Sequence, residues 1–294
     1  MLHFFENLST RELAWVIWFL IAFTASMFSN SIRHSFGSII KALLAWKISV
    51  SLLAFFLHTA FYVLVLFKFG LWDISLLKDT IIWSMSFGFV SLMNINKVNN
   101  STYFKKLFFD TIKWTIVIEF IINFFTFSFI VELIVVPIVV FTAAMQAYAS
   151  HKPEHKPVES LFKYILMASG AFIFIFSLYK TVEQPSRIFT FGNFKSFFLP
   201  IFLSITFLPF MYVYNLIVKY EELWVRLNFS IRNKQDRKRV KRQILYVANF
   251  NIDKLVMISK NIAKPVNNGD DLSYEMIKKI SKGQYKNCNE LSDK

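Results

Sequence analysis

Residues 112–149 read IKWTIVIEFIINFFTFSFIVELIVVPIVVFTAAMQAYA, a predominantly apolar run of 38 residues that decides the fold. As a single α-helix this run would be about 57 Å long, almost twice the ~30 Å hydrocarbon core of a bilayer. Either the helix projects far out of the membrane, or the chain turns within the run. The most polar patch spans residues 123–128, and Pro137 can bend the second arm. If the chain does turn, the reversal is expected near Thr126, between two arms.

The whole chain has the composition of a membrane protein. Of its 294 residues, 55% are hydrophobic, 18% aromatic and 18% charged, and 36 are Phe. Soluble proteins carry about 25% charged residues, so this much apolar surface cannot be hidden in a globular interior. The composition argues against a disordered chain, a disulfide-stapled secreted fold, a coiled coil and a soluble enzyme. The single cysteine, Cys288, excludes an internal disulfide.

The apolar runs predict an all-α, multi-pass transmembrane helical bundle. Seven spans are counted, and four to six fit if some runs only lie along the membrane. The predicted spans are 13–28, 39–67, 76–95, the two arms of 112–149, 161–178 and 197–218. Ser9 and Glu12 predict a capping box that opens the first helix. Pro209 is a predicted hinge in the last span, because its missing N–H leaves the Ile205 carbonyl unpaired.

Charge divides the chain at Val218. Positions 1–218 hold sixteen basic and ten acidic residues, and the remaining 76 positions hold seventeen and nine. We therefore predict a transmembrane domain over 1–218 and a small basic helical region over 219–294. Alternate short loops carry nine basic residues against six, and the basic tail strengthens this bias. By the positive-inside rule, we expect the carboxyl terminus to lie in the cytoplasm.

Three short helices are predicted in the tail. The first is capped by Ser230, the second begins at Asp253, and the third is capped by Asp271 and ends near Gly283. The first helix carries the densest charge of the chain and supplies the candidate ligand-binding residues. These are Arg232, Lys234, Arg237, Lys238, Arg239, Lys241, Arg242 and Tyr246, the last as an aromatic ring that can stack. Charge alone fits acidic membrane lipids, positive-inside anchoring, or an anionic ligand such as an oligonucleotide.

Two carboxyl groups lie inside the 38-residue run. Glu119 and Glu132 are costly in lipid, by about 2.5–3.5 kcal/mol each, so such groups normally face a bundle interior or water. With a turn near Thr126 the two acids lie at a similar depth, and Asn123 is one helical turn from Glu119. In a symmetric oligomer all three are candidate pore-lining residues for cations. The competing interpretation is structural, with Glu119 paired to Lys113 or protonated and hydrogen-bonded.

No enzyme signature is present. The sequence has no glycine-rich phosphate loop, nucleophile elbow, HExxH motif or cysteine pair. His151 and His155 have the spacing of two helical metal ligands, but the prolines and lysines around them argue against a metal site. We therefore predict no enzymatic activity, no cofactor and no metal. His58, alone in the second span, is interpreted as a packing residue rather than a proton relay.

Several segments resemble a family of bacterial multispan membrane proteins. They are residues 8–13 (LSTREL), 71–83 (LWDISLLKDTIIW), 119–132 (EFIINFFTFSFIVE) continuing to Pro137, 207–212 (FLPFMY) and 220–224 (YEELW). Together they cover roughly residues 1–227 and stop at the basic tail. The family is similar to the channel-forming effectors of the Hailong anti-phage defence system, which act together with a nucleotidyltransferase.

The resemblance implies a homo-oligomeric ion channel, for which a tetramer is one candidate state. In that family a cytoplasmic crown domain binds single-stranded DNA oligomers that hold the channel shut. The tail would then sense the ligand, and loss of ligand would open the pore and depolarise the membrane. Two other functions stay open from the residues themselves. One is a proton-coupled secondary transporter using His58 and Glu119, and the other is a non-conducting receptor whose tail binds acidic lipids.

Overall fold

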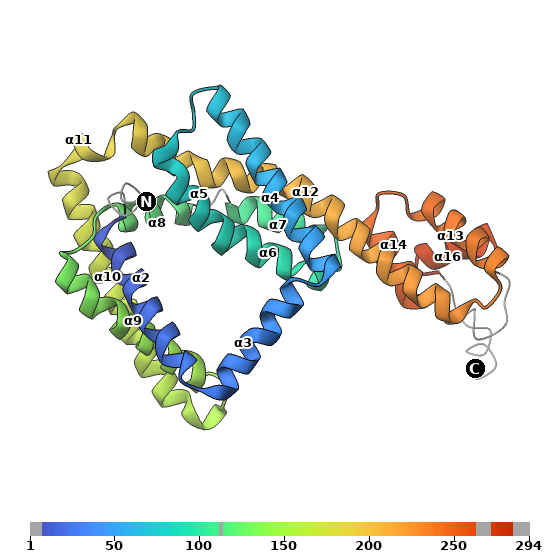
Figure 1. The fold of residues 1–294 in the computed structure, drawn as a ribbon, viewed down its shortest axis with the longest axis horizontal. Coiled ribbons are helices and arrows are strands. Elements are labelled where there is room, and N and C mark those ends of the chain that lie inside the picture. The colour runs from blue at the N-terminus through green and yellow to red at the C-terminus, as the bar shows by residue number, and fades with distance from the viewer. Residues whose placement is uncertain (1–7, 112–113, 263–271, 285–294) are drawn as a thin grey trace. The chain divides into compact units, whose positions relative to one another are not determined.

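The computed structural model describes residues 8–111, 114–262 and 272–284, and within these ranges every regular element is helical (Figure 1). The α-helices of the first half are α2 (Thr10–Met27), α3 (Asn30–Leu43), α4 (Trp46–Lys68), α5 (Leu77–Trp83), α6 (Phe89–Met93), α7 (Thr102–Thr111) and α8 (Trp114–Phe124). Those of the second half are α9 (Phe129–Ala149), α10 (Lys156–Glu183), α11 (Pro185–Ile188), α12 (Phe191–Ser230), α13 (Lys234–Ala248), α14 (Ile252–Asn261) and α16 (Tyr274–Ser281). A π-helical turn, Ser84–Gly88, joins α5 to α6.

The 38-residue run does not form one helix. Helix α8 ends at Phe124 and α9 begins at Phe129, so the chain breaks within the predicted polar patch. Pro137 lies inside α9 without ending it. The predicted turn is therefore confirmed. The described part of its first arm is α8, which has 11 residues, or about 16 Å of helix.

Among the described residues, six helical segments are long and apolar enough to cross a membrane. They are Thr10–Met27, Trp46–Lys68, Ile74–Met93, Phe129–Ala149, Lys156–Glu183 and Phe191–Ser230. The described part of the seventh predicted span is α8, of 11 residues, and residues 112 and 113 directly before it lie outside the described residues. The run 39–67 is also divided, because α3 ends at Leu43 and α4 begins at Trp46. These long apolar helices make the chain a membrane protein.

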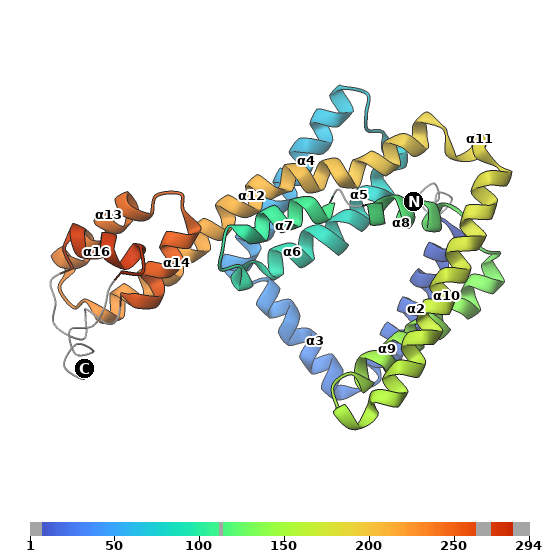
Figure 2. The ribbon, with the colours of Figure 1, turned by 180° about the vertical axis from the view of Figure 1, so that it is seen from behind.

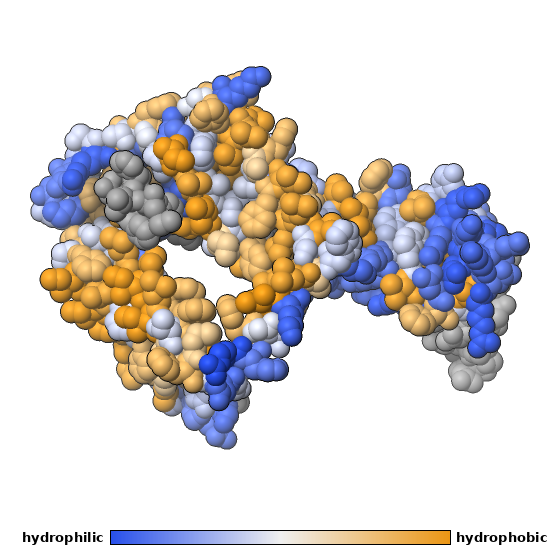
Figure 3. Space-filling model, in the orientation of Figure 1, coloured by the Kyte–Doolittle hydropathy of each residue, from blue (hydrophilic) through white to orange (hydrophobic). Residues whose placement is uncertain are grey.

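The surface of these helices is apolar where a soluble protein would be polar. Phe19 on α2, Phe61 on α4 and Phe141 on α9 are each about 60% exposed or more. In Figure 3, hydrophobic residues dominate the visible face of α2 and α9, while hydrophilic residues dominate that of α13. Exposed apolar area of this extent is stable only in contact with lipid or another apolar surface.

The described chain forms two compact units. The first comprises the described part of Met1–Ser84 together with that of Ile112–Leu203. The second comprises Met85–Thr111 and the described part of Ser204–Lys294. The chain therefore crosses from one unit to the other within α12, at Leu203, rather than at the predicted domain boundary of Val218. The second unit combines the basic tail with the end of α12 and a segment from the first half of the chain.

In the first unit, α9 packs against both α2 and α10, and α10 also packs against α8 (Figure 2). The Trp18 indole N–H on α2 donates to the Leu133 carbonyl of α9 at 2.8 Å. Aromatic contacts join the other helices: Phe55 of α4 lies 6.3 Å from Trp83 of α5, and Tyr62 of α4 lies 6.1 Å from Phe202 of α12, between ring centroids. Aromatic packing therefore replaces the aliphatic core of a soluble bundle at these crossings.

The second unit has a compact aliphatic core. Helices α13, α14 and α16 pack against one another in the figures and in their contacts. Their fully buried side chains are Ile244, Ile252, Leu255, Ile258, Ile277 and Ile280. Burying one such side chain contributes roughly 1.5–3 kcal/mol relative to leaving it exposed. The basic tail is thus a folded helical bundle, although it is too polar outside to enter lipid.

Local sequence signals set most helix ends. At the start of α2, Ser9 Oγ accepts from the Glu12 N–H and Glu12 Oε2 accepts from the Ser9 N–H, which confirms the predicted capping box. In the tail, Asn251 caps α14 and Gly283, at φ +70°, follows the end of α16, both close to the predicted positions. The predicted cap at Ser230 is wrong.

The reason for that error is the length of α12. This helix continues to Ser230, whose hydroxyl donates back to the Arg226 carbonyl, and the cap of α13 is Asn233. Helix α16 is capped by Ser273. The predicted cap, Asp271, lies outside the described residues.

Candidate ligand-binding site

A hollow of about 410 Å³ lies on one face of α13. It is lined by Gln235, Lys238, Arg239, Arg242, Gln243 and Tyr246. These positions recur every three or four residues, so the helical repeat places them on one stripe. The opposite stripe of α13, including Val240 and Ile244, is buried in the core of the second unit. The core therefore fixes which face of α13 is presented outward.

The hollow concentrates positive charge. Arg239 Nη2 lies 3.6 Å from Asp236 Oδ1, but both side chains are about half exposed, so this pair is weak. Lys238 and Arg242 form no ion pair with any described residue. Three guanidinium or ammonium groups thus face the hollow with one carboxylate nearby. Such a surface attracts phosphate and other anions and holds them with counterion release.

The structure separates the predicted ligand-binding residues into two groups. Lys238, Arg239, Arg242 and Tyr246 line the hollow together. The remaining four are Arg232, Lys234, Arg237 and Lys241, which do not line it.

Lys241 has a packing role. Its Nζ donates to Asn228 Oδ1 at 3.0 Å and lies 5.3 Å from the centre of the Trp224 ring.

Two residues of the hollow, Gln235 and Gln243, were not predicted from the sequence. Their spacing from the basic residues was the available signal, because it places them on the same stripe.

Two tyrosines of α12 hold the turn between α13 and α14. The Tyr212 hydroxyl donates to the Phe250 carbonyl at 2.6 Å, and the Tyr220 hydroxyl donates to the Asn249 carbonyl at 2.7 Å. Asn249 has φ +46°, a left-handed conformation that is unfavourable for a residue with a side chain. The tail is therefore tied to α12 by side-chain hydrogen bonds at the point where its backbone is most constrained.

The same part of α12 also holds the segment 95–101. Asn215 Nδ2, fully buried, donates to the Ile95 carbonyl at 2.9 Å, and Lys219 Nζ donates to the Asn96 carbonyl at 3.0 Å. From the tail, the Asp253 carboxylate accepts from the Ser101 N–H at 2.9 Å and from its hydroxyl at 2.5 Å. We call residues 95–101 the coupling segment. It contacts both α12 and α14, so displacement of either helix must break or move these bonds.

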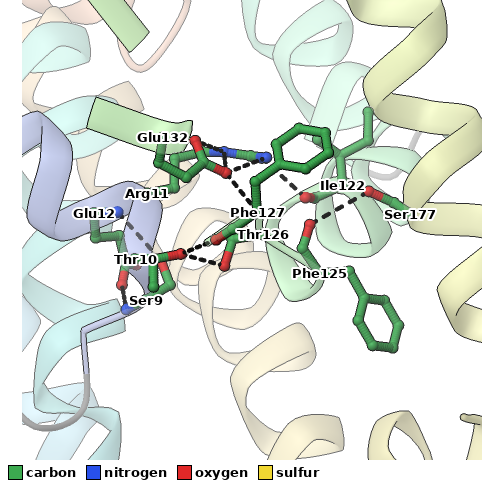
Figure 4. A network of polar contacts seen from close by, with 10 residues as sticks. All are labelled: Ser9, Thr10, Arg11, Glu12, Ile122, Phe125, Thr126, Phe127, Glu132 and Ser177. Atoms are coloured by element: carbon green, nitrogen blue, oxygen red, sulfur yellow. Dashed lines mark hydrogen bonds and ion pairs between the residues drawn. The ribbon is translucent and has the colours of Figure 1, made fainter. Parts of the chain in front are cut away.

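A second cluster of polar residues lies in the first unit, where α2 meets the break between α8 and α9 (Figure 4). Arg11 and Glu132 form an ion pair, with Nη2 2.9 Å from Oε1 and Nε 3.2 Å from Oε2. Glu132 is 1% exposed, and its Oε1 also accepts from the Phe127 N–H at 3.0 Å. We call this cluster the polar junction. Its carboxylate is buried and satisfied by an opposite charge and a backbone donor.

The end of α8 and the start of α9 favour the charges of Arg11 and Glu132, respectively. Ile122 lies in the last turn of α8, where backbone carbonyls lack helical partners, and Arg11 Nη1 donates to its oxygen at 3.0 Å. Glu132 lies in the first turn of α9, where the helix dipole favours a negative charge. The Thr10 hydroxyl completes the junction through contacts of 2.7 Å with Thr126 Oγ1 and the Phe127 carbonyl. The polar patch thus breaks the helix and is then bound by α2.

The predicted pore-lining residues do not form one cluster in the single chain. Glu132 belongs to the polar junction, so its geometry favours the structural interpretation. The Asn123 side chain is exposed near the end of α8. Glu119 also lies in α8, but its side chain is outside the described residues, and Lys113, its predicted partner, is outside them entirely. A pore-lining role for Glu119 and Asn123 stays a prediction.

Two further predictions concern single residues in the spans. Helix α12 continues through Pro209 without interruption, so the predicted hinge is a helix position rather than a break. His58 on α4 lies 4.8 Å from Tyr62, between ring centroids, which agrees with the packing interpretation. The described residues contain no group of three or more metal-ligating side chains.

Comparison of the chain with protein-family models, with curated proteins and with solved structures gave no match.

Proposed function

We propose that this chain is the subunit of a homo-oligomeric ion channel in the bacterial inner membrane, with its basic tail in the cytoplasm. The tail binds a short single-stranded DNA oligomer that holds the channel closed. Loss of the ligand opens the pore, depolarises the membrane and stops phage propagation in the infected cell. A nucleotidyltransferase that makes the oligomer is the functional partner. The role in defence rests on the resemblance of residues 1–227 to the Hailong effectors.

The observation that carries this proposal is the hollow of α13. It presents Lys238, Arg239 and Arg242 on a folded unit that also contains the second half of α12. An anion bound there neutralises three like charges that otherwise repel one another. Charge neutralisation on a helix packed against α14 and α16 therefore changes the stability of a small bundle that is tied to a membrane-spanning helix.

The hydrogen bonds around the coupling segment supply a route for gating. Tyr212 and Tyr220 connect the α13–α14 turn to α12, and Asp253 connects α14 to Ser101. Asn215 and Lys219 connect α12 to the same segment. A ligand can gate the channel only if it binds one arrangement of these contacts more tightly than the other. The closed and open states would differ in whether this set of bonds is intact.

The direct test measures single-channel currents of the full-length protein in planar bilayers, with and without a single-stranded DNA 10-mer on the tail side. The wild type should conduct and be closed by the oligomer. The triple variant Lys238→Gln, Arg239→Gln and Arg242→Gln should conduct but resist closure. A matched control, Lys278→Gln with Lys279→Gln on α16, removes exposed cations of the same unit and should close normally. Absence of unitary currents under every condition would exclude a channel.

Ion selectivity tests the predicted pathway separately. Glu119→Gln removes one negative charge per subunit and should shift the reversal potential under a cation gradient, if the side chain lines the pore. Asn123→Asp is the complementary variant, since it adds a charge one helical turn away and should shift the potential in the opposite direction. Unchanged reversal potentials in both variants would show that α8 does not line the ion pathway. They would not contradict the proposal that the protein is a channel.

A non-conducting receptor for acidic lipids is the second candidate. Exposed cations on α13 share the helix with the exposed side chains of Leu245 and Tyr246, and the exposed Phe250 follows the helix end, a pattern that also suits a membrane surface. This alternative predicts that anionic lipid in nanodiscs protects α13 from hydrogen exchange, whereas neutral lipid does not. Protection by the DNA oligomer in neutral nanodiscs would favour the channel instead.

A further inference from the structure

Helix α3 carries an apolar stripe that the rest of the described chain leaves largely exposed. The helix has 14 residues, and none of them is buried. Its large apolar side chains recur at spacings of three and four residues, which places them on one side of the helix. They are Ile32, Phe36, Ile39, Ile40 and Leu43. Phe36 contacts Phe23 of α2, with 5.5 Å between ring centroids, but Ile39 is 56% exposed and Ile32 45%.

The opposite side of α3 is polar and positively charged. Helical geometry places Asn30, His34 and Lys41 on that side and Arg33 at the border of the apolar stripe. The Arg33 guanidinium donates to Asn30 Oδ1, and neither Arg33 nor Lys41 has an ion-pair partner among the described residues. Positions 13–72 contain no Asp or Glu. The exposed cations of α3 are therefore complementary to an anionic partner.

The position of α3 in the chain determines its depth in the membrane. Residues 28–29 and 44–45 are all that separate it from α2 and α4, which are both long and apolar enough to cross a membrane. In Figures 1 and 2, α3 runs from the end of α2 to the start of α4. Its 14 residues measure about 21 Å, less than the ~30 Å hydrocarbon core, so both of its ends reach the same membrane surface. A helix with both ends at one surface lies along that surface.

The junction between α3 and α4 has the composition of a membrane interface. Trp46, the first residue of α4, is 81% exposed, and Lys47 follows it. Tryptophan is enriched at the level of the lipid headgroups, because its ring is apolar and its N–H is polar. The start of α4 is therefore suited to the edge of the hydrocarbon core, which is also where α3 ends.

We propose that α3 is an interfacial helix that lies along the membrane surface and binds acidic phospholipid headgroups. Its apolar stripe enters the boundary of the acyl chains, and Arg33 and Lys41 contact the headgroup phosphates. A second copy of the chain is a poorer partner, since a symmetric contact between two α3 helices brings together cations with no carboxylate between them. The inference requires only a membrane protein, so it does not depend on conduction or on a ligand of α13.

The first experiment measures the depth of each face of α3 in the full-length protein in nanodiscs. Cys288→Ser removes the natural cysteine, and Ile39→Cys or His34→Cys then introduces one site for a nitroxide label. The label at position 39 should collide mainly with oxygen dissolved in the acyl chains. The label at position 34 should collide mainly with a water-soluble nickel complex.

Two results of the labelling would overturn the interfacial placement. Access of the nickel complex to both labels would show that α3 projects into water. Protection of the label at position 39 from both reagents would show that protein covers the stripe, as in a contact between copies.

The second experiment tests the headgroup contacts through hydrogen exchange of the α3 amides. Exchange in wild-type protein should be slower in nanodiscs of phosphatidylglycerol than in nanodiscs of neutral phosphatidylcholine. Arg33→Gln with Lys41→Gln should reduce this difference by about fivefold for each cation removed, the factor expected for one basic residue near an anionic surface. Equal exchange of the wild type in the two lipids would overturn the binding of acidic headgroups.

A matched control shows whether the effect belongs to α3. Lys278→Gln with Lys279→Gln removes two exposed cations from α16 and should leave the exchange of the α3 amides unchanged in both lipids. A loss of the lipid difference in this control would mean that net charge, rather than the cations of α3, determines the response, and would also overturn the proposed contacts.

Discussion

The polar junction of the first unit and the hollow of the second both contain charged side chains, but the charges have different roles in the two places. At the junction, one arginine meets one buried glutamate, and the remaining donors and acceptors are met by backbone groups of two helix ends. On α13, three cations share a surface with one exposed aspartate. Charge that is matched inside a protein holds its structure. Charge that is unmatched and exposed is available to a ligand.

A charged residue in an apolar chain can therefore have either of two roles. Glu132, inside an apolar run, would be expected to mark a pathway for ions, yet its carboxylate is enclosed by α2 and by its own helix start. The residues of α13, in the most polar part of the chain, are the better candidates for function. Burial and the presence of a partner decide the role more than the hydrophobicity of the surrounding sequence does.

The largest effect is expected from breaking the junction. Glu132→Ala leaves Arg11 without its carboxylate at a site where Glu132 is 1% exposed and Arg11 14%. Removing one partner of a buried pair costs about 3–5 kcal/mol, so thermal unfolding of the protein in detergent should occur at a much lower temperature. The double variant Arg11→Met with Glu132→Leu should recover part of this loss, because no unpaired charge is left.

An exposed ion pair in the same unit is the control for that prediction. Lys180 Nζ lies 2.6 Å from Glu183 Oε2, with both side chains about a third exposed or more. Glu183→Ala should change stability by about 0–1 kcal/mol. If it destabilises the protein as much as Glu132→Ala does, burial does not distinguish the two pairs and the contrast between matched and unmatched charge is lost.

The second effect concerns the salt dependence of ligand binding. Each phosphate neutralised on a single strand contributes a slope of about −0.7 to the logarithm of affinity against the logarithm of salt concentration. Replacing Lys238, Arg239 and Arg242 with glutamine should therefore make the slope shallower by about 2. Affinities at five salt concentrations provide the measurement. An unchanged slope would show that the oligomer binds elsewhere.

A smaller, stabilising effect is expected at the turn between α13 and α14. Asn249→Gly should raise the unfolding free energy by about 1 kcal/mol, because glycine adopts φ +46° without the strain of a side chain. The hydrogen bond from Tyr220 reaches the backbone carbonyl of residue 249 and survives the substitution. Asn251→Gly, two residues later, is the control and should destabilise, since Asn251 caps α14. Chemical denaturation in mild detergent measures both.

The smallest effect is a pH dependence at the surface of the first unit. Hydrogen bonds from Ser75, with a contribution from Lys195 at 3.3 Å, lower the pKa of Asp73 below its ordinary value. A carboxyl group with a lowered pKa in the folded state stabilises the protein at pH values above the unfolded pKa of ~3.9 and loses this contribution as pH falls further. Asp73→Asn should therefore reduce the acid sensitivity of the melting temperature slightly between pH 5 and pH 3.

Local signals in the sequence predict much of this fold. The capping box of Ser9 and Glu12, the break within residues 123–128 and the basic stripe of α13 each depend on residues within a few helical turns. Such features follow from helix geometry and from the preferences of polar residues for helix ends. The same rules failed at Ser230, because α12 continues to this residue, its hydroxyl donates to the Arg226 carbonyl, and Asn233 caps α13 instead.

The long-range contacts were not predictable from one sequence. Arg11 and Glu132 are 121 residues apart, and Ser101 and Asp253 are 152 apart, with no pattern that joins them. Asn215, which binds the coupling segment, lies in an apolar helix and has no distinguishing neighbours. Only the packing of the helices brings these groups together. The positive charge of the candidate site was therefore predictable from the sequence, but the hydrogen bonds that connect its unit to α12 and the coupling segment were not.

The separation of Arg11 from Glu132 has a consequence for how the protein is made. At about 5–20 residues synthesised per second, residue 132 is made roughly 6–24 s after Arg11. During that interval the guanidinium of a nascent α2 has neither the carboxylate nor the Ile122 carbonyl that it binds in the finished molecule. Arg11 can therefore reach its final set of contacts only after residue 132 has been synthesised, so the polar junction forms late in the synthesis of the first unit.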